Sequence, residues 1–100
     1  MEAAVKSYEQ ALAIKPDYAE AHYNLGVTFQ ESGQLGASVK SYEQALAINP
    51  DCAEASSNLG LIFHELGQLE AAVKSYEQAL ATKPDYAEAH NNLGATLQER

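Results

Sequence analysis

The sequence has one cysteine, no tryptophan and few basic residues. Because Cys52 has no second cysteine to pair with, an internal disulfide is excluded, and a reducing compartment such as the cytoplasm is expected. No apolar run approaches the ~20 residues that a membrane-spanning helix requires, so no membrane partner is expected. No signal peptide or basic amphipathic presequence is visible at the start of the sequence.

Positive charge is also scarce. Six lysines and arginines stand against fourteen acidic residues, which gives a formal net charge of −8 at pH 7. Nucleic-acid backbones and anionic membranes attract proteins through Lys/Arg patches, so the charge balance argues against nucleic acid as a partner. The balance favours neutral or basic partners, although solubility alone also accounts for an acidic surface.

What the sequence does contain is one pattern that occurs three times. The segment 4–13 returns with few changes at 38–47 and 72–81. The residues that recur at intervals of 34 positions include three prolines and three asparagines: Pro16, Pro50, Pro84, Asn24, Asn58 and Asn92. A period of this length is typical of stacked helix-turn-helix repeats, in which each unit buries its apolar side against its neighbours.

Apolar spacing within each repeat predicts helices. In the first segment Val5, Tyr8 and Leu12 fall on one face at the α-helical period. The prolines end one helix of each pair, and Gly33 and Gly67 end the other as glycines just beyond a helix C-terminus. The predicted helices cover residues 2–14, 19–32, 36–48, 53–66, 70–82 and 87–100. Because the loops are short, successive helices are expected to be antiparallel neighbours.

Two local features of the helices also repeat. Asp17 and Glu20 have the spacing of a capping box, as do their counterparts in the next two repeats, so each aspartate is predicted to cap a helix. Glycines also recur within helices, where each costs roughly 1 kcal/mol relative to alanine. A repeated cost implies a repeated packing reason, and we expect a close backbone approach between these glycines and small residues of a partner helix. The glycines and small residues are Gly26, Gly60, Gly94, Ala4, Ser38 and Ala72.

At this level of detail the sequence resembles the tetratricopeptide repeat (TPR) family. The matching features, in the family's order and spacing, are Asn-Leu-Gly at 24–26, 58–60 and 92–94, Phe29, Phe63, Tyr42, Tyr76, Ala45, Ala79, Pro50 and Pro84. The resemblance implies an all-α fold, a right-handed α-solenoid of antiparallel helix-turn-helix TPR units. One departure is that His22, Ser56 and His90 stand where the family usually has a large aromatic residue. Looser packing is expected there.

The resemblance also implies how a single array, residues 1–100, is divided into repeats. Residues 2–14 are the second helix of a partial repeat, 19–50 and 53–84 are full repeats, and 87–100 is the first helix of another partial repeat. The two incomplete ends could complete each other between molecules. End-to-end contacts between copies are therefore expected in a crystal, and a self-assembling repeat unit is an alternative function.

In this family the first helices line a concave groove, which implies a non-catalytic scaffold that binds an extended polypeptide segment. Asparagine side chains offer both a donor and an acceptor to a peptide backbone. The asparagine ladder is similar to that in the repeat region of O-linked N-acetylglucosamine transferase, where it holds polypeptide. A substrate-docking segment of a larger enzyme such as a glycosyltransferase is thus a further alternative, and contact with a neighbouring helix is the structural alternative for these asparagines. The expected groove residues are Glu20, Tyr23, Asn24, Val27, Gln30, Glu54, Ser57, Asn58, Leu61, His64, Glu88, Asn91 and Asn92.

Catalysis, metal binding and cofactor binding are not expected. Serines, histidines and acidic residues repeat with the 34-residue period and do not converge on one place. The three histidines lack the close spacing of metal ligands. Cys52 replaces a tyrosine found at positions 18 and 86, which indicates a packed loop residue and not a nucleophile. The groove helices also lack the lysines and arginines that family members use to clamp a terminal carboxylate.

Overall fold

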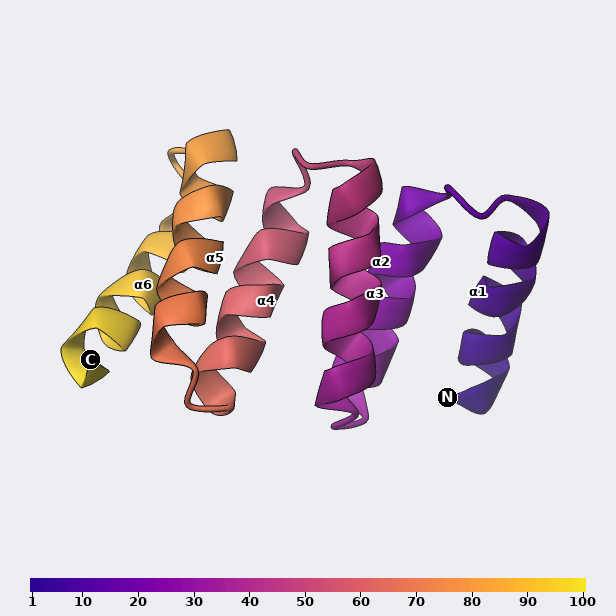
Figure 1. Ribbon diagram of the computed structural model, residues 1–100, viewed down its shortest axis with the longest axis horizontal. Helices are drawn as coiled ribbons and strands as arrows, with labels where there is room; N and C mark the ends of the chain where they lie inside the picture. Colours follow the sequence, from indigo (N-terminus) through magenta and orange to yellow (C-terminus); the bar gives the residue numbers. More distant parts are fainter. The chain divides into compact units, whose positions relative to one another are not determined.

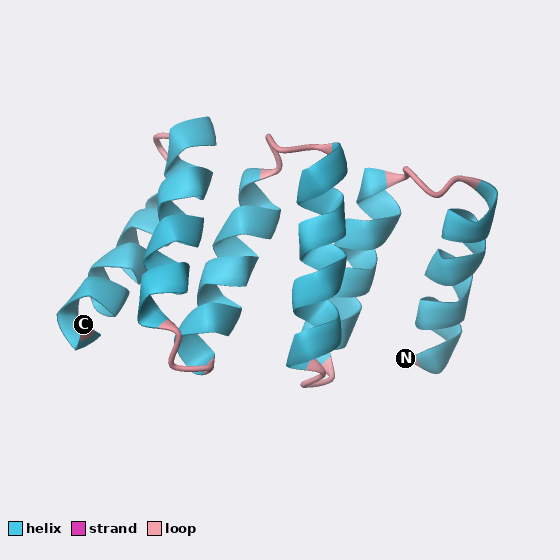
Figure 2. Ribbon diagram, viewed as in Figure 1, coloured by secondary structure: helices cyan, strands magenta, loops and turns pink.

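The computed structural model describes residues 1–100, and every regular element in it is a helix (Figure 2). The predicted all-α fold is therefore confirmed. The helices are α1 (Glu2–Ile14), α2 (Ala19–Glu31), α3 (Leu35–Ile48), α4 (Ala53–Glu65), α5 (Leu69–Thr82) and α6 (Ala87–Glu99). They form two compact units: residues 1–50 hold α1 to α3, and residues 51–100 hold α4 to α6. None of the helices is long and apolar enough to span a membrane.

In the first unit α2 packs against both α1 and α3 (Figure 1). The predicted C-terminal glycine is confirmed, because Gly33 has a φ of 77° and follows the last residues of α2 directly. The backbone N–H of Gln34 then donates to the carbonyl oxygen of Phe29 at 2.8 Å, which satisfies one of the free carbonyls at the helix end. This tight turn places α3 along α2, where Tyr42 of α3 is completely buried.

In the second unit α5 contacts both α4 and α6. Gly67 closes the turn after α4 as Gly33 does after α2, with a φ of 77°. One cluster of the core consists of small residues around one ring, Tyr76, and Phe63 and Leu93 pack against it at its edge. The residues of this cluster are Ala53, Ala72, Tyr76, Ala79 and Ala89. Other apolar residues of this unit are buried as well, among them Leu59, Ile62 and Val73.

The predicted capping boxes are wrong. The residues that precede α2, α4 and α6 are Tyr18, Cys52 and Tyr86, and none of them makes a side-chain capping hydrogen bond. The cause is a turn at the Pro-Asp sequence, in which the N–H of Tyr18 donates to the carbonyl oxygen of Lys15 at 3.1 Å. That turn leaves Asp17 one residue too early to act as the N-cap. In the second repeat Cys52 is accordingly the N-cap residue, and α4 begins at Ala53.

The close approach predicted at the helical glycines is found between Gly26 and Ser38, but the space left by the missing side chains at Gly26 and Gly60 is filled by a tyrosine ring. A Cβ atom added at Gly26 would lie 2.6 Å from Cδ1 of Tyr42, and one added at Gly60 would lie 2.5 Å from Cε1 of Tyr76. Ser38 has a supporting role, since its hydroxyl donates to the carbonyl oxygen of Gly26 at 2.7 Å. At Gly94 no atom lies within 4 Å of such a Cβ, so the approach predicted there is absent.

The histidines in place of aromatic residues tie the helix starts to the preceding loops. Nε2 of His22 lies 3.1 Å from the carbonyl oxygen of Pro16, and Nε2 of His90 lies 2.9 Å from that of Pro84. Because a carbonyl only accepts hydrogen bonds, the proton in each pair sits on Nε2. Ser56, the third residue at this position, is buried, so the looser packing expected there is not found.

Candidate peptide-binding surface

On α2 the predicted binding residues divide into an accessible group and a supporting group. Glu20 is exposed and accepts a hydrogen bond from the hydroxyl of Tyr18 at 3.3 Å, while Asn24 and Val27 are half-buried. Glu20 and Asn24 border an open hollow of about 340 Å³ between α1 and α2. This part of the predicted surface is therefore recessed and offers both a carboxylate and a carboxamide.

Tyr23 and Gln30, also on α2, contact a buried ring of α3. The ring centroids of Tyr23 and Tyr42 are 5.7 Å apart with a tilt of 56°, and the hydroxyl of Tyr42 donates to Oε1 of Gln30 at 2.7 Å. Both predicted binding residues thus support the pairing of α2 with α3.

In the second unit His64 connects α4 to α6. Its Nδ1 lies 2.7 Å from Oγ1 of Thr96, and its Nε2 pairs with the carboxylate of Glu99. The hydroxyl of Thr96 donates to the carbonyl oxygen of Asn92 at 3.0 Å, so its oxygen is left to accept from His64. Sequence reasoning missed Thr96. The available signal was the histidine itself, which replaces the glutamine found 34 residues before and after it.

The remaining predicted residues of α4 and α6 differ in exposure. Asn58 and Asn92 are half-buried, and Leu61 is 37% exposed. Ser57, by contrast, is 1% exposed, so its hydroxyl lies below the surface and cannot reach a bound peptide. Glu54, Glu88 and Asn91 are exposed as well.

The charges on these three helices are of one sign. None of α2, α4 and α6 contains a lysine or an arginine, and each contains two glutamates, one near each end. The cations closest to the helix starts belong to the loops, where Lys15 and Lys83 lie over the rings of Tyr18 and Tyr86, with 5.2 and 4.7 Å to the centroids. Such a surface repels anionic ligands and attracts cationic ones.

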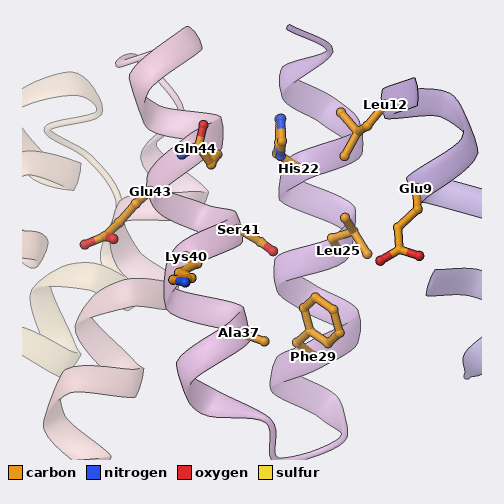
Figure 3. Close-up of a pocket in the computed structure, with 10 residues that line it drawn as sticks. All are labelled: Glu9, Leu12, His22, Leu25, Phe29, Ala37, Lys40, Ser41, Glu43 and Gln44. Atoms are coloured by element: carbon orange, nitrogen blue, oxygen red, sulfur yellow. The ribbon is translucent and has the colours of Figure 1, made fainter. Parts of the chain in front are cut away.

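A larger hollow in the first unit lies away from these residues. It has a volume of about 620 Å³ and lies among α1, α2 and α3. Figure 3 shows Leu25 and Phe29 along α2, with Leu12 reaching toward them from α1 and Ser41 from α3. None of its lining residues belongs to the predicted binding set. No group of three potential metal ligands is present in the chain.

Helix pairs that recur every 34 residues, with accessible polar groups on one helix of each pair, define a helical-repeat protein. The family model described as "TPR repeat" matches residues 1–33, 28–67 and 60–99. The chain therefore belongs to the TPR family, as its sequence motifs indicated. Repeats of this family are generally non-catalytic interaction modules.

Similar solved structures show the same fold. The crystal structure of MamA has a TM-score of 0.91 and 25% sequence identity, covering 95% of this chain and 56% of MamA. The first TPR of Spaghetti bound to an HSP90 peptide has a TM-score of 0.90 and 24% identity, covering 95% of this chain and 75% of that one. The Thermobaculum terrenum O-GlcNAc transferase has a TM-score of 0.85 and 33% identity, covering 93% of this chain and 18% of that one.

This chain spans about half the length of the MamA structures that it matches. A search of curated proteins found no match.

Proposed function

We propose that this chain is an interaction scaffold that binds an extended polypeptide segment through α4 and α6 of the second unit, and that α2 of the first unit carries an equivalent surface. The observation that carries the proposal is the surface of α4 and α6. Leu61 is exposed one turn from Asn58 on α4, and exposed Asn91 adjoins Asn92 on α6. The hydrogen bond between His64 and Thr96 joins these two helices, so the carboxamides are held on a fixed base. Fixed donors and acceptors bind a peptide backbone with little loss of conformational entropy.

The partner that fits this surface is neutral or basic. The peptide bound by the first TPR of Spaghetti is SRMEEVD, which has three acidic side chains. Helices α2, α4 and α6 carry glutamates and no lysine or arginine, so an anionic peptide would meet like charge there. A peptide with lysine or arginine side chains would instead pair with Glu54 and Glu88 of the second unit, or with Glu20 of the first.

Three short fluorescent peptides of matched length test the charge preference: one basic, one uncharged and one acidic. We expect the fluorescence anisotropy titration to give the order basic, uncharged, acidic, from tightest to weakest. Binding of the basic peptide should weaken as salt is added, because exposed charges are screened. Equal or tighter binding of the acidic peptide would contradict the proposal.

The asparagines are tested with the same peptides. Replacing Asn24, Asn58 and Asn92 together by alanine should weaken binding of the basic peptide by about tenfold or more, since each lost hydrogen bond contributes about 1 kcal/mol. The exposed residue Gln78 lies on α5, outside the proposed surface, so Gln78→Ala is the matched control. Circular dichroism should show that both variants retain their helices. An unchanged affinity in the triple variant would reject the role of the asparagines.

A second candidate is a substrate-docking segment of a larger enzyme. It is supported by the 33% identity to the O-GlcNAc transferase structure over 93% of this chain. Assaying the full-length polypeptide for transfer of a sugar from a nucleotide sugar to a peptide tests this candidate. Absence of transfer would reject this candidate and leave the interaction scaffold as the proposed function.

A further inference from the structure

Helix α1 has the same sequence as α5 but different surroundings. Residues 2–13 are identical to residues 70–81. In α5 this sequence buries Ala72, Val73, Tyr76 and Ala79, whereas α1 has no buried residue. Because the side chains are the same, the difference lies in what packs against them. Helix α5 lies against two helices, α4 and α6, and α1 lies against α2 alone.

Helix α4 covers α5, and α1 has no equivalent of α4. The feature of α4 that matters is a glycine that makes room for a tyrosine of the neighbouring helix. Tyr76 of α5 fills the space over Gly60 of α4, and Tyr42 of α3 fills the space over Gly26 of α2. Tyr8 of α1 is the counterpart of these tyrosines and is only half-buried. With Ser7 and Ala11 it borders the hollow of about 340 Å³ beside α2. Because α1 contacts α2 alone, and Tyr42 already fills the space over Gly26 of α2, no glycine-bearing helix covers Tyr8 as α4 covers Tyr76.

Helix α6 carries the complementary surface. Its Gly94 corresponds to Gly26 and Gly60 in the 34-residue period, yet no atom lies within 4 Å of a Cβ placed there. Its Leu97 is 43% exposed, whereas the corresponding residues Phe29 and Phe63 are half-buried. We define the Gly94 notch as the exposed surface of α6 around Gly94 and Leu97.

We propose that the Gly94 notch of one molecule binds α1 of a second copy, with Tyr8 over Gly94 as Tyr76 lies over Gly60. The occupant is specified by sequence, because residues 2–13 repeat residues 70–81 and so include a counterpart of every residue that is buried in α5. The two surfaces are neutral at their centres, Tyr8 with Ala4 and Ala11 on one side and Gly94 with Leu97 on the other. They differ from each other, so the contact is heterologous and each added copy exposes a new notch. Since each chain has a net charge of −8, screening by salt should strengthen the association.

Sedimentation velocity of the 100-residue chain over a wide concentration series tests the contact. We expect the sedimentation coefficient to rise continuously with concentration, and to rise further with added salt. Gly94→Ala should weaken the association by about tenfold or more, because the added methyl group overpacks the contact with Tyr8. Gly36→Ala is the matched control: Gly36 is also helical and has open space around it, so this variant should associate like the unaltered chain.

A mixture of two variants tests the head-to-tail arrangement. Gly94→Ala blocks the notch but leaves α1 available, and Tyr8→Ala removes the ring but leaves the notch available. Each variant alone should sediment as a monomer, and an equimolar mixture should form a dimer and nothing larger. A chain that remains monomeric at every concentration would overturn the proposal, as would equal association of the Gly94→Ala and Gly36→Ala variants. No peptide is present in these measurements, so their outcome is independent of the proposed peptide binding.

Discussion

At the scale of single residues, two equivalent tyrosines differ in one hydrogen bond. Tyr42 and Tyr76 occupy the same position in successive repeats, and each is 0% exposed. The hydroxyl of Tyr42 donates to Gln30 at 2.7 Å, but the hydroxyl of Tyr76 is buried without a partner. The counterpart of Gln30 in the second repeat is His64, which contacts Thr96 and Glu99 instead. Because His64 bonds to α6, the hydroxyl of Tyr76 is left without the hydrogen bond that Tyr42 makes.

Replacing each of these tyrosines by phenylalanine should therefore have opposite consequences. Tyr42→Phe should lower the free energy of unfolding by about 1 kcal/mol, because a hydrogen bond is lost and Gln30 loses its donor. Tyr76→Phe should leave the free energy unchanged or raise it by up to about 1 kcal/mol, since it removes an unsatisfied buried polar group. Urea unfolding of the two variants measures both effects. Equal destabilisation would contradict the unequal hydrogen bonding.

The Tyr76 hydroxyl also makes the free energy of unfolding decrease at alkaline pH. Burial, with a smaller contribution from the carboxylate of Glu88, raises the pKa of Tyr76 from 10.0 to about 12. Because the pKa is higher in the folded state than in the unfolded state, the contribution of Tyr76 to the free energy of unfolding is fully present below pH 10. It is lost as the pH rises through 12. The loss attributable to this group is about 2–3 kcal/mol. The free energy of unfolding, measured by urea titration at several pH values between 9 and 12, should therefore fall more steeply with pH for the unaltered chain than for Tyr76→Phe.

At the scale of helices, the pairing of α4 with α5 depends on the absence of a side chain at Gly60. Alanine favours an isolated helix by about 1 kcal/mol over glycine. At Gly60, however, the added methyl group would meet the buried ring of Tyr76 at 2.5 Å, and overpacking of this kind costs about 1–3 kcal/mol. Gly60→Ala should thus lower the thermal unfolding midpoint, whereas Gly36→Ala should raise it. A higher midpoint for Gly60→Ala would show that the ring moves freely.

The helices themselves were predictable from the sequence, and each observed helix begins and ends within one residue of its predicted bounds. The reason is that apolar spacing, the prolines and the two turn glycines act locally. The helix caps were not predictable, because the turn that includes the N–H of Tyr18 places Tyr18 and not Asp17 at the N-cap of α2. The glycine contacts required knowledge of which side chain of the partner helix fills the space, and this depends on how the two helices pack.

At the scale of the whole molecule, the repeat assigns the proposed binding surface to α2, α4 and α6, but it does not predict which of their side chains are exposed. The 34-residue period places Tyr23, Ser57 and Asn91 at the same position. In the structure the first contacts Tyr42, the second is buried and the third is exposed. Exposure at a repeated position is set by the neighbours on other helices, which differ from repeat to repeat. A periodic sequence therefore predicts position better than accessibility.

The identity of α1 and α5 has a consequence for how the chain finds its fold. During refolding, α4 can meet either α1 or α5. Because residues 2–13 and 70–81 are identical, the fit of the side chains does not favour one of these helices over the other. Connectivity does: only residues 66–68 separate α4 from α5, whereas residues 15–52 separate it from α1. Closing the longer connection costs about 2 kcal/mol more in chain entropy. The length of the connecting segment therefore decides that α5, and not α1, packs against α4. Helix α1 keeps the surface that we propose binds a second copy.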